Sequence, residues 1–141
     1  MLYIATDHAG WELKQSLIHK LTEQKVMFLD LTPELNPGDD YPNVAKLLAD
    51  SIKNNPANLG IGLCGSGQGI TMALNRYPWI RAIISKEPEI VKITKIHNKS
   101  NVMCLAGRFW SLEEVWPVIK IFLKTEFDSH ARHQRRIDMI S

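Results

Sequence analysis

Short apolar runs alternate with longer amphipathic stretches along the chain. Aliphatic runs have the length and composition of β-strands at positions 2–6, 26–31, 59–64, 81–85 and 101–106. The run at 59–64 is apolar at nearly every position, as expected of a strand that helices cover on both faces. We therefore predict an α/β fold, a three-layer α/β/α sandwich around a five-stranded parallel, Rossmann-like sheet.

Apolar residues at helical spacing fill the intervals between these runs. Leu13, Leu17 and Leu21 recur every four residues and place one apolar stripe on a helix. Ser111, with Glu114 three residues later, has the capping-box pattern that opens a helix. Further helices are predicted at 44–52, around 72–74, at about 87–97 and, rich in basic residues, from about 129 onwards.

Size and composition limit how the chain is organised. With 141 residues and 45% hydrophobic content, it has room for one domain, spanning residues 1–141. No apolar run approaches the roughly 18 residues that a membrane-spanning helix needs. The chain begins directly with a strand-like run, and its two cysteines are better explained as reduced thiols than as a disulfide. We therefore expect a cytoplasmic protein with no membrane partner.

Charge and the spacing of ligand-type residues argue against several partners. Seventeen basic residues oppose fifteen acidic ones, so no overall field favours nucleic acid. Asp128 and Asp138 flank the basic C-terminal stretch, which further weakens a nucleic-acid interpretation. The five histidines and the carboxylates near them do not have the spacing of metal ligands, so we expect no metal site and no cofactor.

A glycine-rich turn follows the apolar run at 59–64. It reads Cys64, Gly65, Ser66, Gly67, Gln68, Gly69. The carboxyl end of a parallel strand is where ligands bind in such sheets, and closely spaced glycines let backbone N–H groups approach an anion. A helix N-terminus or a ring of amides also stabilises a thiolate, which makes a cysteine a competent base. The turn therefore predicts an anion site with Cys64 at its start.

Other interpretations of this turn differ in how well they fit. A dinucleotide-binding turn needs a different glycine spacing and an acidic residue after the next strand, where Ser85 and Lys86 stand. A cysteine phosphatase loop needs an arginine six positions after the cysteine, and that position is Ile70. The remaining alternative is structural: Cys64 is a small buried hydrophobe and the glycines only form a tight turn.

Asp7 and His8 follow the first predicted strand directly. The carboxyl ends of parallel strands meet at one edge of the sheet, so both residues should lie near Cys64. Asp7 also suits the N-cap of a helix, and the two roles are compatible. His8 stands on a loop beside a carboxylate, where a titrating or hydrogen-bonding imidazole is expected.

Taken together, these motifs resemble the ribose-5-phosphate isomerase B family, within a wider group that includes lactose-pathway galactose-6-phosphate isomerase subunits. The resemblance spans essentially the whole chain. It is anchored on Asp7 to Gly10, Asp40 to Pro42, Cys64 to Gly69, Asn75, Arg81, Ala82, His97, Asn98, Asn101, Val102, Gly107, Arg108, Arg132, His133 and Arg136.

The resemblance implies a metal-free aldose–ketose isomerase that interconverts D-ribose 5-phosphate and D-ribulose 5-phosphate, a step of the pentose phosphate pathway, through a cis-enediol. Cys64 would abstract the C2 proton. Other members of the family use a glutamate just past the turn, where this chain has Ile70. Ser66 and the amides of Gly65, Gly67 and Gly69 would stabilise the enediolate, while Asp7 and His97 would assist ring opening.

The resemblance also implies how the substrate is held. Asn98 would orient the sugar, and His8, Arg108, Arg132 and Arg136 would bind its phosphate. In the family the site combines residues of two subunits, so a homodimer or a dimer of dimers is expected. On the residues alone, without the resemblance, a solvated basic surface is the favoured interpretation of the C-terminal helix.

The same resemblance leaves alternatives for the substrate. Allose 6-phosphate or galactose 6-phosphate would undergo the same chemistry, and Lys99 stands where many relatives have an aspartate after the His–Asn pair. Galactose-specific subunits divide the catalytic features between two chains, whereas this chain carries Asp7, His8, Cys64 and His97 together. An alternative of another class is a non-catalytic sugar-phosphate-binding protein.

Overall fold

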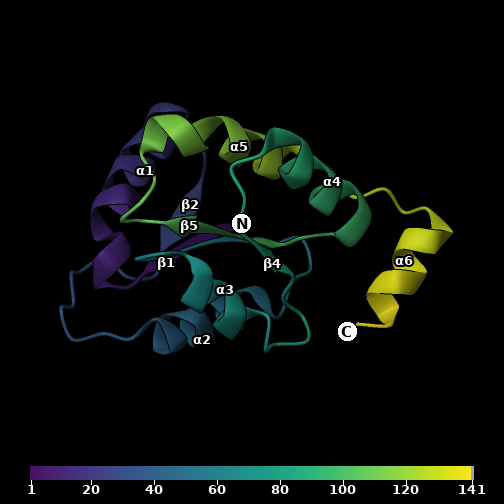
Figure 1. The fold of residues 1–141 in the computed structure, drawn as a ribbon, viewed down its shortest axis with the longest axis horizontal. Helices are drawn as coiled ribbons and strands as arrows, with labels where there is room; N and C mark the ends of the chain where they lie inside the picture. The colour runs from purple at the N-terminus through teal and green to yellow at the C-terminus, as the bar shows by residue number, and fades with distance from the viewer. Residues whose placement is uncertain (141) are drawn as a thin grey trace.

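A five-stranded parallel sheet lies between two layers of helices in the computed structural model, which describes residues 1–140 (Figure 1). The strands lie in the order β2-β1-β3-β5-β4, and every neighbouring pair is parallel. Their bounds are β1 Leu2–Thr6, β2 Phe28–Asp30, β3 Leu59–Cys64, β4 Ala82–Ile83 and β5 Val102–Ala106. The predicted α/β/α sandwich is confirmed.

Helices α2 and α3 cover one face of the sheet, and α1, α4 and α5 cover the other (Figure 1). The helical segments are the 3-10 helix η1 His8–Gly10, α1 Trp11–Glu23, α2 Tyr41–Ile52, α3 Gln68–Leu74, α4 Pro88–Asn98, α5 Leu112–Lys124 and α6 Ala131–Asp138. No helix within residues 1–140 is long and apolar enough to cross a membrane.

Alternate strand residues form two separate cores. Ile61 and Met103 are fully buried against α1, α4 and α5. Val102 and Cys104 are fully buried against α2 and α3. Both faces of the central strands are therefore apolar, because successive side chains of a strand point to opposite faces.

The predicted strand bounds are correct in the centre of the sheet and too long at its edges. The runs at 2–6 and 59–64 are strands over their full length, and the run at 101–106 forms Val102–Ala106. The run at 26–31 forms only Phe28–Asp30, and the run at 81–85 forms only Ala82–Ile83. Both short strands lie at the edges, where each has one neighbour to pair with instead of two.

Candidate active site

The strands β1, β3 and β5 end side by side. The loops that follow their carboxyl ends together form one edge of the molecule. Thr6 pairs with Leu63, and Cys64 pairs with Ala106. Asp7 therefore follows β1 next to the end of β3, and its amide donates to the Leu63 carbonyl at 3.3 Å. The edge carries Asp7, His8, Cys64, Gly65, Ser66, Gly67, Gly69 and Arg108, eight of the twelve site residues predicted from the sequence.

Asp7 caps the short helix η1. Its Oδ1 accepts hydrogen bonds from the amides of Ala9 at 2.9 Å and Gly10 at 3.3 Å, as the N-cap prediction requires. The residue is only 6% exposed. Burial is the main cause that raises the pKa of its carboxyl, while the two amides act in the opposite direction. The amides engage Oδ1, which leaves Oδ2 as the oxygen able to meet a ligand.

The glycine turn connects β3 to α3 beneath this edge. Cys64 is 4% exposed at the last position of β3, and Gly67 has φ +72°, a left-handed conformation that glycine adopts without strain. Ser66 accepts a hydrogen bond from the Gln68 amide at 3.3 Å through its Oγ. The second thiol, Cys104, is fully buried in the sheet, and burial raises its pKa to about 12. Cys104 therefore stays protonated and belongs to the core.

The loops after β1, β3 and β5 touch through their backbones. The Gly107 amide donates to the Cys64 carbonyl at 2.8 Å, and the Arg108 amide donates to the Gly65 carbonyl at 3.0 Å. A methyl group added to Gly107 would lie 2.5 Å from the Gly10 Cα, which no real contact allows. Glycine is therefore required here for three loops to meet at one point.

Arg108 reaches across this junction toward the first loop. A methyl group on Gly65 would contact both the Arg108 Cδ and the Ala9 Cβ at 3.4 Å. The guanidinium thus lies over the glycine turn and beside the loop that carries His8. This arrangement brings a permanent cation and an imidazole to the same edge.

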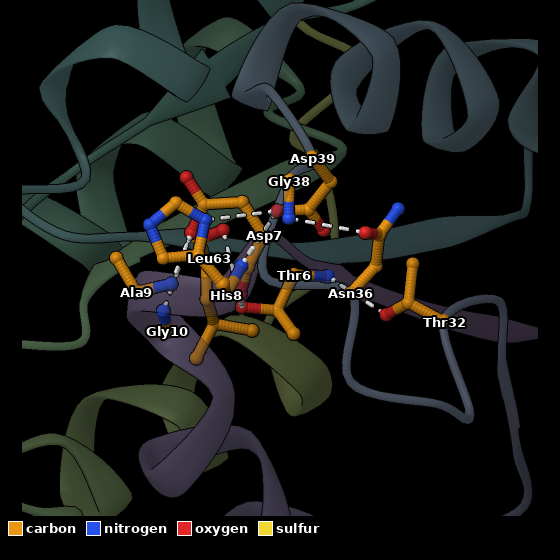
Figure 2. A network of polar contacts seen from close by, with 10 residues as sticks. All are labelled: Thr6, Asp7, His8, Ala9, Gly10, Thr32, Asn36, Gly38, Asp39 and Leu63. Carbon is orange, nitrogen blue, oxygen red and sulfur yellow. Dashed lines mark hydrogen bonds and ion pairs between the residues drawn. The ribbon is translucent and has the colours of Figure 1, made fainter.

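His8 has a partner that the sequence did not reveal. Asp39 Oδ1 lies 3.0 Å from His8 Nδ1 and also accepts the His8 backbone amide at 2.9 Å (Figure 2). Its hydrogen bond to Asp39 is the main cause that raises the pKa of His8. Asp39 lies 31 residues further along a loop without regular structure, so no spacing rule connects the two.

Tyr41 is a second residue at this edge for which the sequence indicated no role. A methyl group on Gly69 would meet the Tyr41 ring at 2.8 to 3.0 Å, so the ring rests directly on the glycine turn. The phenol opens α2 and is 41% exposed. It therefore forms one wall of the edge beside the turn.

The other four predicted site residues lie at the opposite edge of the sheet, where the parallel strands begin. Helix α4 runs back against the strands and ends at His97 and Asn98, shortly before β5 begins. Arg132 and Arg136 lie on α6, which lies near the end of α4 (Figure 1). Helix α6 packs there through His133. At about 3.3 Å per residue, the five residues of β5 alone separate the two edges by about 16 Å. One chain therefore does not bring these residues to Cys64.

The sequence indicated no role for His133. Its ring stacks on the His97 ring with centroids 4.3 Å apart and an interplanar angle of 11°. His133 is 3% exposed, so this stack holds the start of α6 against the end of α4. The contact fixes His97 and the two arginines of α6 as one unit.

A cavity of about 430 Å³ lies at this second edge, on another side of α6. Lys53, Trp79, Arg81 and Lys99 line it, and α6 contributes Gln134, Ile137 and Asp138 to its wall. Arg132 and Arg136 are not among the lining residues, so the cavity is separate from the predicted phosphate ligands.

Comparison with known proteins shows the relationship that this geometry suggests. The sequence pattern that defines the family described as Ribose/Galactose Isomerase matches residues 2–140. The chain belongs to the ribose/galactose isomerase family. The family resemblance inferred from the motifs is thereby confirmed, and the chain is an isomerase of the ribose-5-phosphate isomerase B type.

Relatives within the ribose/galactose isomerase family match over nearly their full length. A probable ribose-5-phosphate isomerase B of Mycoplasma pneumoniae is 41% identical over 140 residues, which cover 99% of this chain and 91% of that protein. The ribose-5-phosphate isomerase B of Escherichia coli is 30% identical over 135 residues, which cover 96% of this chain and 90% of that protein.

Solved structures of ribose/galactose isomerase family members share the fold. A ribose 5-phosphate isomerase from Thermotoga maritima is 37% identical with a TM-score of 0.92, covering 99% of this chain and 95% of that one. The ribose-5-phosphate isomerase B of Mycoplasma genitalium, solved with bound ribulose-5-phosphate, is 37% identical with a TM-score of 0.89, covering 99% and 92%.

Proposed function

We propose that this chain interconverts D-ribose 5-phosphate and D-ribulose 5-phosphate, with Cys64 as the base. The observation that carries the proposal is the meeting of the β1, β3 and β5 loops, which gathers Asp7, Cys64 and Arg108 at one edge. A relative 37% identical to this chain was solved with ribulose-5-phosphate, the proposed ketose product. Cytoplasmic location fits such a metabolic role.

Proton transfer through Cys64 accounts for the isomerisation. The thiolate removes the C2 proton of the open-chain aldose, the C1 carbonyl becomes the enediolate oxygen, and a double bond forms between C1 and C2. Return of the proton from Cys64 to C1, with transfer of the O2 proton to O1, gives the ketose. The amides of Gly65, Gly67 and Gly69 and the Ser66 hydroxyl stabilise the enediolate oxygen, and each preorganised donor is worth about 3 kcal/mol of barrier.

Ring opening needs a proton acceptor and donor on opposite sides of the sugar. Asp7 is suited to one of these two roles because its pKa is raised toward neutral pH. Its Oδ2 is also not bound by the capping amides. His97 supplies the other, and Asn98 orients the sugar. Both belong to the opposite edge of the sheet, so in this proposal a second copy of the chain provides them.

The phosphate is held from both copies in the same way. His8 and Arg108 come from the chain that provides Cys64, and Arg132 and Arg136 come from α6 of the partner copy. The two α6 arginines lie four positions apart, on one face of the helix. A homodimer, alone or within a dimer of dimers, is therefore the smallest assembly with a complete site.

Substitution of Cys64 tests the mechanism. We expect Cys64→Ala to lower kcat with ribose 5-phosphate by about 10²- to 10⁴-fold, because it removes the general base, while substrate binding measured by calorimetry persists. Cys104→Ala, a matched thiol-to-methyl change in the neighbouring strand, should retain most activity. Unimpaired turnover by Cys64→Ala would rule out the cysteine base.

Parallel assays separate the substrate alternatives. Wild-type protein without added metal is given ribose 5-phosphate, allose 6-phosphate and galactose 6-phosphate at matched concentrations. The proposal requires the highest kcat/KM with ribose 5-phosphate. Binding of the sugar phosphates without turnover of any would favour the non-catalytic binding protein instead.

A further inference from the structure

Asp39 holds His8 through two hydrogen bonds to a single oxygen. The His8 amide lies 2.9 Å from Asp39 Oδ1 and the imidazole Nδ1 lies 3.0 Å from it (Figure 2). Two contacts of this kind fix both the backbone and the ring of His8. The Asp39 carboxylate thus determines the direction in which the imidazole points, although the ring is 40% exposed.

The contact also determines which ring nitrogen faces away. An ionised carboxylate only accepts hydrogen bonds, so His8 Nδ1 carries the proton that lies between them. Nε2 is then the nitrogen left for a ligand. It accepts a hydrogen bond when the ring is neutral and donates one when the ring is charged.

Two carboxylates act on His8: Asp7, which precedes it after β1, and Asp39, from the loop before α2. Asp39 acts through its hydrogen bond and its charge, and Asp7 acts through its charge from the preceding residue. Both raise the pKa of His8, and the hydrogen bond to Asp39 is the largest cause. The imidazolium therefore persists to higher pH than in a free histidine.

The loop that carries Asp39 is itself held by a tight turn. Asn36 accepts the Gly38 amide at 3.1 Å through its Oδ1, and its carbonyl accepts the Asp39 amide at 3.3 Å (Figure 2). Thr32 binds the Thr6 amide at 3.0 Å through its Oγ1, which ties the start of the same loop to β1. A turn therefore presents the Asp39 carboxylate to His8, and the loop that contains this turn is tied to β1, the strand that precedes His8.

We propose that Asp39 is a positioning residue for substrate binding, which holds His8 as a Nδ1-protonated imidazole whose Nε2 donates a hydrogen bond to the substrate phosphate. This inference rests on the proposed function, in which His8 binds the phosphate. Asp39 itself touches no substrate. Its role is to keep a charged donor aimed at a dianion beside the Arg108 guanidinium.

Substitution of Asp39 by Asn tests this role by two independent readouts. Asparagine retains an oxygen that can accept the two hydrogen bonds but removes the negative charge. The first readout is a titration of the His8 ring nitrogens by ¹⁵N NMR in the absence of substrate. The second is KM and kcat for ribose 5-phosphate measured from pH 6 to pH 8.5. Asp50→Asn, which removes the carboxylate of an exposed ion pair with Lys46, is the control.

We expect the His8 pKa to fall in Asp39→Asn and to stay unchanged in Asp50→Asn. At pH 7.5 the KM of Asp39→Asn should rise about threefold to fivefold with little change in kcat, the scale of one exposed charge contact. The difference should shrink as the pH falls toward 6, because the protonated fraction of His8 then rises in both proteins. Because the two proteins are compared at the same pH, ionisation of the substrate phosphate affects both KM values equally.

The outcomes separate this inference from the function on which it rests. An unchanged His8 titration in Asp39→Asn overturns the inference at its first step. A raised KM in His8→Ala with an unchanged KM in Asp39→Asn also overturns it, while the phosphate role of His8 stands. An unchanged KM in His8→Ala contradicts the proposed phosphate site instead.

Discussion

Lys95 places a charged amine among apolar side chains between α4, α5 and the start of β5. It is 8% exposed, donates to the Ser100 carbonyl at 3.1 Å and lies over the Phe122 ring at 4.6 Å from its centroid. It has no carboxylate partner within the 140 described residues. Burial, followed by the charge of Arg81, lowers the pKa of Lys95 to about 8.

The lowered pKa predicts a pH dependence of stability. Between pH 8 and 10.5 the unfolded chain binds the Lys95 proton and the folded chain releases it, so folding becomes more favourable as the pH rises. In Lys95→Met this contribution disappears. We expect the stability of wild type relative to Lys95→Met to grow across this window, by at most about 1.4 kcal/mol per pH unit.

Chemical denaturation at pH 7.5, 9 and 10.5 measures this change. Lys92→Met, an exposed position on the same helix, is the control and should follow wild type at all three values. A constant difference between wild type and Lys95→Met would show that Lys95 titrates normally in the folded protein.

Helix α5 shows how much local sequence specifies an element. The Glu114 amide donates to the Ser111 Oγ at 3.4 Å, and Glu114 Oε2 accepts the Ser111 amide at 2.8 Å. This is the capping box that the sequence predicted. The side chain of Glu114 also accepts a hydrogen bond from Lys86 Nζ at 2.9 Å, which ties the N-terminus of α5 to the segment after β4.

Loss of this cap should be measurable. We expect Ser111→Ala to lower the free energy of unfolding by about 1 kcal/mol, because an amide at the N-terminus of α5 loses its acceptor. Ser16→Ala provides a matched control, since Ser16 binds a carbonyl inside α1 and alanine is the better helix former there. Equal effects of the two substitutions on the urea midpoint would contradict a specific capping role.

The elements also show where prediction from the sequence ends. The bounds of β1 and β3 could be predicted because buried central strands are apolar throughout. Position 26 is apolar as well, yet β2 begins only at Phe28, since pairing at a sheet edge depends on a single neighbour. The contact between Asp39 and His8 could not be predicted from the sequence, because it depends on the path of an irregular loop.

At the scale of the whole molecule, the candidate site is divided between two edges of one sheet. Sequence motifs predicted Cys64 and Asp7 as neighbours, because both follow parallel strands. The motifs did not predict at which edge of the sheet α4, whose end carries His97, and α6 would lie. The stack of His97 on His133 joins these two helices and could be found only from the structure.

This division predicts that two inactive chains can complement each other. A Cys64→Ala chain and an Arg132→Ala/Arg136→Ala chain are co-expressed with different tags and purified on both. Each mixed dimer then has one site with every side chain intact, so its activity should be about half that of wild type. Each variant alone should be nearly inactive.

Activity of the mixed dimer no higher than that of its parents would contradict a shared site. A matched preparation in which both differently tagged chains carry Cys64→Ala controls for the effect of tagging and should remain inactive.

The contact of Gly107 with Gly10 bears on how such a protein can vary during evolution. Surface loops ordinarily accept insertions and exchanges independently of one another. Here a single added methyl group at Gly107 would collide with the backbone of the first loop, and Gly107 also binds the Cys64 carbonyl. Any heritable change in the length or course of one of these three loops must therefore be matched in the other two.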